Sequence, residues 1–253
     1  MSNPISGIAY FFKGLSLITQ PGIRRWVFIP FIINLLLFCV LVYYAWLWFP
    51  IVTPFLVAQM GGWLPSWAWL VSIVNWLLMP LVIIVFFIGI FFIFTFLATL
   101  IGGPFNDLLA EAVEKHLTGK PIDSPSESIL KGVIGVIGKQ IGKLLYYFKW
   151  FLVLLIISFI PIINIVSPIL WFLFGAWLVS LEYADSPLGN HGYKPPAQRK
   201  ILGQKRLLTL GFGSIVLMVM LIPLINFFVM PIAVAGITAM WVEEFANSAS
   251  SSK

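Results

Sequence analysis

The most conspicuous shortage in this 253-residue chain is charge. Only 9% of its residues are charged, against roughly 25% in an average soluble domain, and none of them lies between Trp26 and Asn106. A soluble domain needs charged side chains on its outer faces, so this run excludes a soluble fold. A bilayer core of about 30 Å takes roughly 20 apolar residues per helical crossing. The run therefore predicts two long transmembrane helices and the turn between them.

Cysteine and the common enzyme motifs are also scarce. The single cysteine, Cys39, lies inside the charge-free run, so no disulfide framework exists. The chain has no phosphate-binding P-loop, no G-x-G-x-x-G motif after a strand and no Ser, Cys or His nucleophile arrangement. His116 stands outside any zinc-binding spacing. We therefore expect no cofactor, no metal and no enzymatic activity.

The net charge of +6 bears on the choice of partner. Nucleic-acid binding needs a basic patch on a suitable domain, and no basic, aromatic-interleaved soluble domain is present here. Anionic lipid headgroups or an anionic solute fit a basic membrane protein better. We therefore expect anionic partners and no nucleic acid.

Prolines, glycines and charges divide the N-terminal half into helices. Residues 1–20 place apolar side chains near helical spacing, which predicts an amphipathic helix in the membrane interface. Long transmembrane helices are expected at 22–50 and 66–117, with a Gly- and Pro-rich turn and a belt of tryptophans between them. The polar, low-complexity end at 246–253 predicts a disordered tail.

Two further charge-free runs in the C-terminal half carry prolines near their middle. Proline breaks a helix, and the resulting arms of roughly 11–16 residues reach about 16–24 Å, short of a full crossing. The residues P-I-I-N at 161–164 recur as P-L-I-N at 223–226, and duplicated Pro-interrupted segments often mark transport sites. We therefore predict half-membrane hairpins at 143–185 and 205–245. One kinked full-length helix per run is the alternative.

The predicted fold class is an all-α integral membrane protein with a single helical membrane domain over 1–245. If both hairpins return to their own side, every charge before the tail lies on one side, including the segment 185–200. We expect that segment to be a loop with His191 on its surface. The loop on the other side, about 49–66, has no charge. By the positive-inside rule the charged side is cytoplasmic.

The strongest candidate for chemistry is the stretch Pro21, Gly22, Ile23, Arg24 and Arg25. The first amides of a helix lack intrahelical acceptors, and the positive end of its dipole points outward. Two arginines in that position disfavour the helix by themselves but favour it when an oxyanion is bound. The alternative is that these arginines only set topology and contact lipid phosphates.

Acidic and amide side chains near or within the apolar runs are the next candidates. Asp107, Glu111 and Glu114 stand at i, i+4 and i+7, which places three carboxylates on one helical face. Such a face suits a pore vestibule, ion pairs across the fold or plain solvation. Asparagines in apolar runs need partners, and helix-helix hydrogen bonds are the alternative to a pore role. The pore or gating candidates are Asn34, Asn106, Asp107, Glu111, Asn164 and Asn226.

These motifs together resemble the CysZ family of bacterial inner-membrane sulfate permeases. The resemblance runs from Gly7 to about Phe245 and rests on the arginine motif at 22–25, the Gly-Pro-Phe-Asn-Asp-Leu-Leu-Ala-Glu stretch at 103–111 and the two Pro-x-x-Asn tips. It implies channel-like sulfate uptake for cysteine synthesis, with two long transmembrane helices and two half-membrane hairpins. The resemblance also implies homo-oligomers. Dimers whose two protomers are inverted in the membrane would conflict with the single orientation predicted above.

The resemblance carries a sulfate-binding Gly-hydrophobic-Arg element onto Gly22, Ile23, Arg24 and Arg25, with Ile at a position that is often Leu. Our hypothesis is that this element captures sulfate at the cytoplasmic interface. The carboxylates and asparagines would then line or gate a path between protomers. Sulfite and thiosulfate are possible alternative substrates.

Two other functions stay open at this point. One is a membrane-embedded enzyme that uses Asp107, Glu111 and His116 on a lipid substrate. The other is a non-transporting membrane scaffold that associates through its small-residue faces. The first predicts metal dependence, and the second predicts a stable partner without ion flux.

Overall fold

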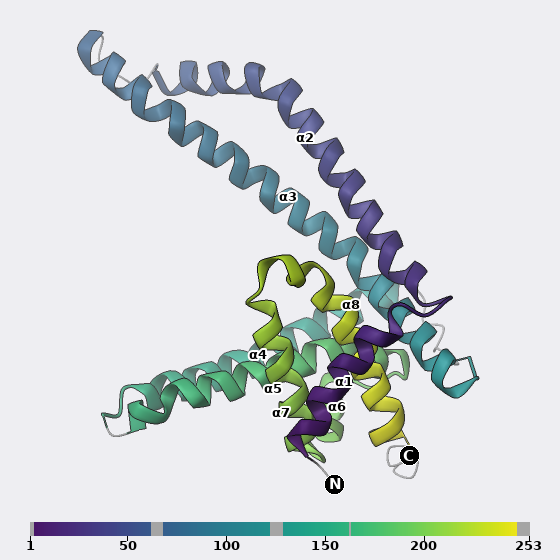
Figure 1. Cartoon of the computed structure of the whole chain (residues 1–253). Coiled ribbons are helices and arrows are strands. Elements are labelled where there is room, and N and C mark those ends of the chain that lie inside the picture. The colour runs from purple at the N-terminus through teal and green to yellow at the C-terminus, as the bar shows by residue number, and fades with distance from the viewer. Residues whose placement is uncertain (1–2, 62–67, 122–128, 162, 247–253) are drawn as a thin grey trace. The chain divides into compact units, whose positions relative to one another are not determined.

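The computed structural model describes residues 3–61, 68–121, 129–161 and 163–246, and its regular elements there are all helical (Figure 1). This confirms the predicted all-α class. A short 3-10 turn, η1, and a π-helical turn, η2, accompany the α-helices. The elements are α1 (Pro4–Leu17), α2 (Arg24–Gly61), α3 (Ala68–Thr118), α4 (Ile129–Ser158), η1 (Ile163–Val166), α5 (Ser167–Asn190), α6 (Pro195–Gly203), α7 (Arg206–Met220), α8 (Pro223–Met240) and η2 (Trp241–Phe245).

Five helical stretches in the described ranges are long and apolar enough to cross a membrane. A sixth candidate is the pair α6 and α7, which is bent by 106°. Length and hydropathy therefore agree with a multi-pass membrane protein. The five stretches are Arg24–Val52, Pro80–Thr118, Gln140–Ser158, Asn164–Asn190 and Phe228–Phe245.

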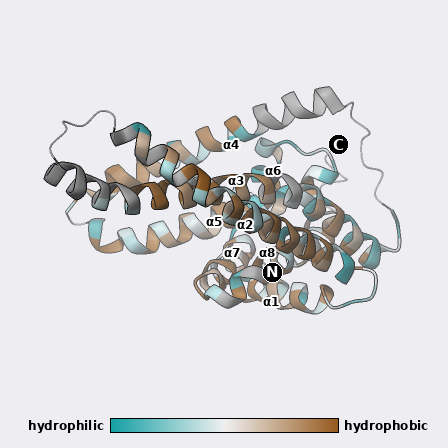
Figure 2. Cartoon of the chain, turned by 90° about the horizontal axis from the view of Figure 1, so that it is seen from above, coloured by the Kyte–Doolittle hydropathy of each residue, from teal (hydrophilic) through white to brown (hydrophobic). Residues whose placement is uncertain are grey.

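One of the two compact units of the chain is formed by residues 28–104. Within it α2 and α3 run antiparallel, because Phe38 contacts Phe94 and Phe49 contacts Phe86 edge to face at 5.7 and 5.6 Å between ring centroids. Figure 2 shows that hydrophobic residues predominate along both helices. Most of the described apolar side chains there are exposed, as expected of a surface that faces lipid tails.

Helix α2 continues past its predicted end at residue 50 and reaches Gly61. Pro50 and Pro54 lie inside the helix and do not end it. A proline removes one helical hydrogen bond, but in apolar surroundings the remaining amides have no better partner than the helix. The predicted turn therefore begins later than the prolines suggested.

Helix α3 agrees with the predicted range 66–117 over its described part, and its last residue is Thr118. Residues 62–67, where the predicted turn falls, lie outside the described residues. So does the predicted tail beyond Ala246. The division into units does not test the predicted single domain over 1–245, which stays a prediction.

The second compact unit contains residues 1–27 and 105–253, and α8 is its central helix. Every residue from Ile232 to Met240 is buried. Helices α1 and α7 both pack against α8, and α5 packs against α7 and α8. An apolar helix that is surrounded in this way forms the core of its unit.

Glycines permit close contact between α1 and its two neighbours. A Cβ atom at Gly7 would lie 2.1 Å from the Leu208 carbonyl oxygen, and one at Gly14 would lie 2.2 Å from that of Ile232. On the opposite side, a Cβ atom at Gly236 would lie 2.5 Å from the Tyr10 carbonyl oxygen. Small residues thus let these backbones approach, as is common between membrane helices.

The outer side of α1 carries exposed apolar side chains, among them Ile5, Phe12 and Leu15. These belong to the apolar stripe that predicted an interfacial helix. The opposite side, with Tyr10 and Phe11, is buried against the unit. The stripe is therefore free for contact with lipid, and the interfacial position of α1 stays a prediction.

Helices α4 and α5 form the first predicted hairpin. The chain turns between Ser158 and Ser167, whose hydroxyl oxygens lie 2.5 Å apart. Trp171 Nε1 donates to the Ser158 hydroxyl at 3.0 Å, and the rings of Phe151 and Trp171 pack edge to face. These hydrogen bonds and the ring contact therefore join the end of α4 to the start of α5 near the turn between them.

Helices α7 and α8 form the second hairpin, with its break at Leu221 and Ile222 (Figure 1). Pro223 opens α8, where a proline is tolerated, while Pro231 lies inside it. Helix α7 has 15 residues, within the predicted arm length, whereas α8 has 18, α5 has 24 and α4 has 30. Helices α4 and α5 extend into charged sequence, which a count of apolar residues leaves out. Helix α8 has no charged residue and exceeds the predicted length because it continues through Pro231. Half-membrane insertion stays a prediction.

The segment 185–200 is largely helical, so its prediction as a loop is wrong. Helix α5 continues to Asn190, and α6 begins at Pro195 with prolines in its first turn. A proline in the first turn needs no amide partner, which explains how a Pro-Pro pair opens a helix. The non-helical connection between α5 and α6 is limited to residues 191–194.

Candidate functional site

The start of α2 is a tight turn in which Gly22 has a positive φ of 89°. The Gln20 carbonyl accepts hydrogen bonds from the amides of Ile23 and Arg24 at 3.2 and 3.1 Å. The Ile23 side chain is 2% exposed and anchors the turn in the core. Glycine adopts this backbone conformation without strain, and a Cβ atom at this position would meet no other atom within 4 Å. The turn therefore leads directly into the two arginines.

The Ile23 amide is already engaged, while the Gly22 and Arg25 amides find no backbone acceptor among the described residues. The side chains of Arg24 and Arg25 are exposed. No carboxylate of the described ranges forms an ion pair with either of them. Of the predicted amide donors, Gly22 is thus open and Ile23 is satisfied. An oxyanion at this turn would meet two unpaired guanidinium groups.

Three lysines of the same unit have carboxylate partners among the described residues. Lys13 pairs with Glu243, and Lys205 pairs with Glu244. The Tyr10 hydroxyl donates to both of these carboxylates at 3.2 Å. Burial, and next the two neighbouring carboxylates, raise the pKa of Tyr10. This cluster joins α1, the start of α7 and the π-helical turn η2.

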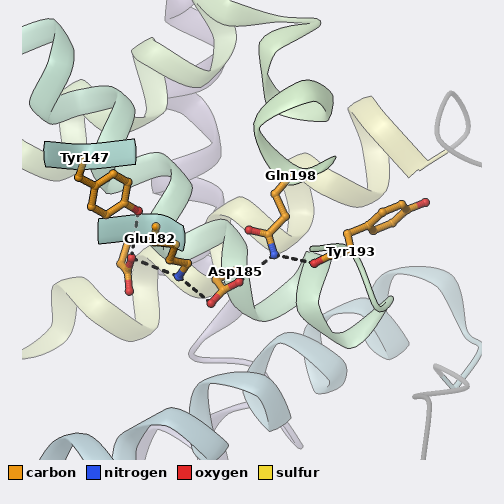
Figure 3. A network of polar contacts seen from close by, with 6 residues as sticks. Tyr147, Glu182, Asp185, Tyr193 and Gln198 are labelled. Atoms are coloured by element: carbon orange, nitrogen blue, oxygen red, sulfur yellow. Dashed lines mark hydrogen bonds and ion pairs between the residues drawn. The ribbon is translucent and has the colours of Figure 1, made fainter. Parts of the chain in front are cut away.

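Lys143 of α4 is the centre of a second paired cluster, and Figure 3 shows its carboxylate partners Glu182 and Asp185. Its side chain is 5% exposed, and its ammonium group lies 2.7 Å from Asp185 and 3.4 Å from Glu182. Tyr147 donates to Glu182, and Gln198 of α6 donates to Asp185 at 2.8 Å. These contacts connect α4, α5 and α6, and the two carboxylates are occupied within the network.

The predicted carboxylate face of α3 is divided by the fold. Asp107 is exposed, Glu111 is half-buried and Glu114 is buried. The Asp107 backbone carbonyl accepts a hydrogen bond from the Asn190 side chain at 2.8 Å. Asn106, which precedes it, is half-buried at the same end of the unit. Only part of the face is therefore available to line an aqueous path.

Glu114 forms a contact that the sequence did not indicate. Its two carboxylate oxygens lie 2.9 and 3.0 Å from His191 Nε2, and a carboxylate can only accept, so Nε2 carries the proton. The His191 ring packs at 5.4 Å from the ring of Trp241, and Tyr193 packs on the same indole at 5.7 Å. The expectation of a simple surface histidine is therefore wrong.

Trp241 itself is 4% exposed, and its Nε1 donor has no hydrogen-bond partner among the described residues. It begins η2, and π-helical turns often occur at functional sites. The two aromatic neighbours of this tryptophan, His191 and Tyr193, come from the distant connection after α5. No local pattern could have identified them.

The remaining asparagine candidates lie in separate places. Asn164 and Asn226 are exposed near the tips of the two hairpins. Asn34 belongs to the unit formed by residues 28–104, and its buried Oδ1 atom has no partner in the part of the chain that the structure describes. An amide oxygen in apolar surroundings favours a donor from elsewhere. Their pore role stays a prediction.

Comparison with known proteins identifies relatives for nearly the whole chain. Residues 10–231 match the family model described as "Sulfate transporter CysZ/Etoposide-induced protein 2.4". The curated "Sulfate transporter CysZ" of Pectobacterium atrosepticum is 37% identical over 251 residues. That alignment covers 96% of this chain and 86% of the relative.

Proposed function

The chain belongs to the sulfate transporter CysZ/etoposide-induced protein 2.4 family, and we propose that it carries sulfate across the bacterial inner membrane as a channel-like permease. Sulfate uptake follows from this family membership and from the multi-pass helical fold. Beyond sulfate uptake itself, we propose that the protein lies in the bacterial inner membrane, that sulfate passes through a channel-like route, and that the sulfur supplies cysteine synthesis. It also includes homo-oligomers and contact with anionic lipids.

The observation that carries the binding site is the pair of adjacent arginines beside an open glycine turn. Arg24 and Arg25 are exposed and have no ion-pair partner in the described ranges, a property that they share with exposed lysines such as Lys149 and Lys200. They differ from these lysines because both stand in the first turn of one helix. Two adjacent guanidinium groups at a helix start repel each other and the helix dipole. A dianion relieves both costs at once.

Sulfate also sets requirements for the path beyond this turn. A dianion is strongly hydrated, so moving it into a low dielectric without replacing that hydration is very costly. Passage therefore needs a partly hydrated route with hydrogen-bond donors and weak, successive sites. We propose that the end of α3 with Asn106, Asp107 and Glu111, and the asparagines Asn34, Asn164 and Asn226, line or gate this route.

Radiolabelled sulfate flux into proteoliposomes tests the proposal. The double variant Arg24→Ala/Arg25→Ala should reduce the initial uptake rate at least tenfold at low sulfate, because both guanidinium partners are lost. The matched control is Lys149→Ala/Lys200→Ala, which removes the same charge from exposed positions. Flux that falls equally in both double variants would indicate a general charge effect. Unchanged flux and binding in the arginine variant would reject the site.

A further inference from the structure

We infer that Trp26 is a positioning residue that holds the guanidinium group of Arg25 ready for the oxyanion. The inference rests on the proposed function and deepens it. The Arg25 guanidinium carbon lies over the Trp26 ring, 5.0 Å from its centroid. A guanidinium group over an aromatic face is attracted by the ring electrons and keeps its N–H groups directed outward at its edge.

This contact is not imposed by helix geometry. Adjacent residues on a helix point in directions about 100° apart and do not face each other. The side chain of Arg25 therefore folds back to lie over its neighbour. The attraction between the guanidinium group and the ring offsets part of the conformational entropy that the arginine side chain loses in this position.

The ring that Arg25 contacts is itself fixed. Trp26 is half-buried and packs against the hydrophobic core of its unit, with Ile23 and Val27 buried beside it. Its indole also contacts the ring of Phe105, at 6.4 Å between centroids and a tilt of 50°. Phe105 lies on α3 at the start of the stretch that holds Asn106 and Asp107. The contact between Trp26 and Phe105 thus holds the arginine motif at the start of α2 next to the 103–111 stretch of α3.

Arg24 and Arg25 differ in their contact with aromatic rings. Arg24 has no aromatic contact among the described residues, whereas Arg25 does. Binding an anion with a flexible side chain requires that side chain to be ordered, which lowers the affinity. The structure therefore predicts that Arg25 is preorganised by Trp26 and that Arg24 is not. This difference makes the inference testable within one site.

The experiment is a set of double-mutant cycles on sulfate affinity, measured by calorimetric titration of the purified full-length protein with sodium sulfate. Trp26→Leu should weaken sulfate binding about two- to fivefold, the range of an exposed cation–π contact. In an Arg25→Ala background it should have no further effect. In an Arg24→Ala background it should retain its full effect. Trp26→Phe, which keeps a ring, should restore most of the affinity.

Three results would overturn the inference. Trp26→Leu could bind sulfate like the unsubstituted protein, or it could weaken binding equally in the Arg25→Ala background. The third is normal binding by Arg25→Ala itself, and this result alone also removes the binding site of the proposed function. If Trp26→Leu does not fold, Phe105→Leu replaces it in the same cycles, because it removes the support of the indole. The same criteria then apply.

Discussion

His191 Nε2 lies 2.9 Å from Oε1 of Glu114, although 77 residues separate them in the chain. The contact connects the end of α3 to the connection between α5 and α6. Glu114 is 8% exposed, so its carboxylate has lost most of its contact with water. A buried carboxylate without a partner is strongly disfavoured, and His191 therefore satisfies a requirement of the fold.

Replacement of His191 tests this contact. His191→Ala leaves the buried Glu114 carboxylate without its donor and should destabilise the protein by about 2 kcal/mol. The result should appear as a lower unfolding midpoint in a thermal scan of the detergent-solubilised protein. His116→Ala is the matched control, because His116 is exposed on the same helix as Glu114. Equal midpoints for both variants would contradict a stabilising role of the pair.

The glycine contacts between α1 and α8 predict a steric effect. Gly14→Ala places a Cβ atom 2.2 Å from the Ile232 carbonyl oxygen, so the helices must separate. We expect a loss of about 1–3 kcal/mol, the range of overpacked cores. Gly142→Ala is the control, because open space surrounds that helical glycine. It should be neutral or mildly stabilising, and an equal loss in both variants would show that close packing is not the cause.

The network around Lys143 predicts a cost for removing its charge. Lys143→Met leaves Glu182 and Asp185 near each other without the cation that lies between them. We expect destabilisation of about 3 kcal/mol, because breaking a buried pair leaves its partners uncompensated. Lys149→Met, an exposed position on the same helix, should change the unfolding midpoint little. A fully tolerated Lys143→Met would mean that the carboxylates find other partners.

Tyr10 predicts a pH dependence at the alkaline end. Burial and the carboxylates of Glu243 and Glu244 raise its pKa above the ordinary value of 10.0. The folded state then holds the proton more tightly than the unfolded state, so stability falls as pH rises above about 10. Between pH 9 and 11 the unfolding midpoint should fall more steeply in the unsubstituted protein than in Tyr10→Phe. Parallel curves would refute this linkage.

Much of the fold could be predicted from the sequence, because membrane residence imposes strong local rules. Charge-free runs predicted the long helices α2 and α3, and the repeated Pro-x-x-Asn motif predicted the breaks between α4 and α5 and between α7 and α8. That these helix pairs are half-membrane hairpins stays a prediction. The arginine motif and the 103–111 stretch indicated the family, which the comparisons confirm. These features depend on composition and spacing along the chain, and tertiary contacts do not alter them.

The unexpected features depend on contacts between distant segments. Nothing beside Lys143 indicates that it is buried between two carboxylates of α5, and nothing beside His191 indicates Glu114. The prolines at 195 and 196 suggested a loop, yet they open α6 because the first turn of a helix needs no amide partners there. The burial of a charged group is decided by packing across the whole unit, which a local pattern does not contain.

The central claim is that Arg24 and Arg25 bind the sulfate that this protein carries. The most direct measurement is anomalous X-ray diffraction from crystals soaked in selenate, a heavier analogue of sulfate. We predict one strong selenium peak at the start of α2, within hydrogen-bond distance of both guanidinium groups and beside Gly22. The peak should be absent from the Arg24→Ala/Arg25→Ala variant. A strongest peak elsewhere, or an unchanged peak in that variant, would contradict the claim.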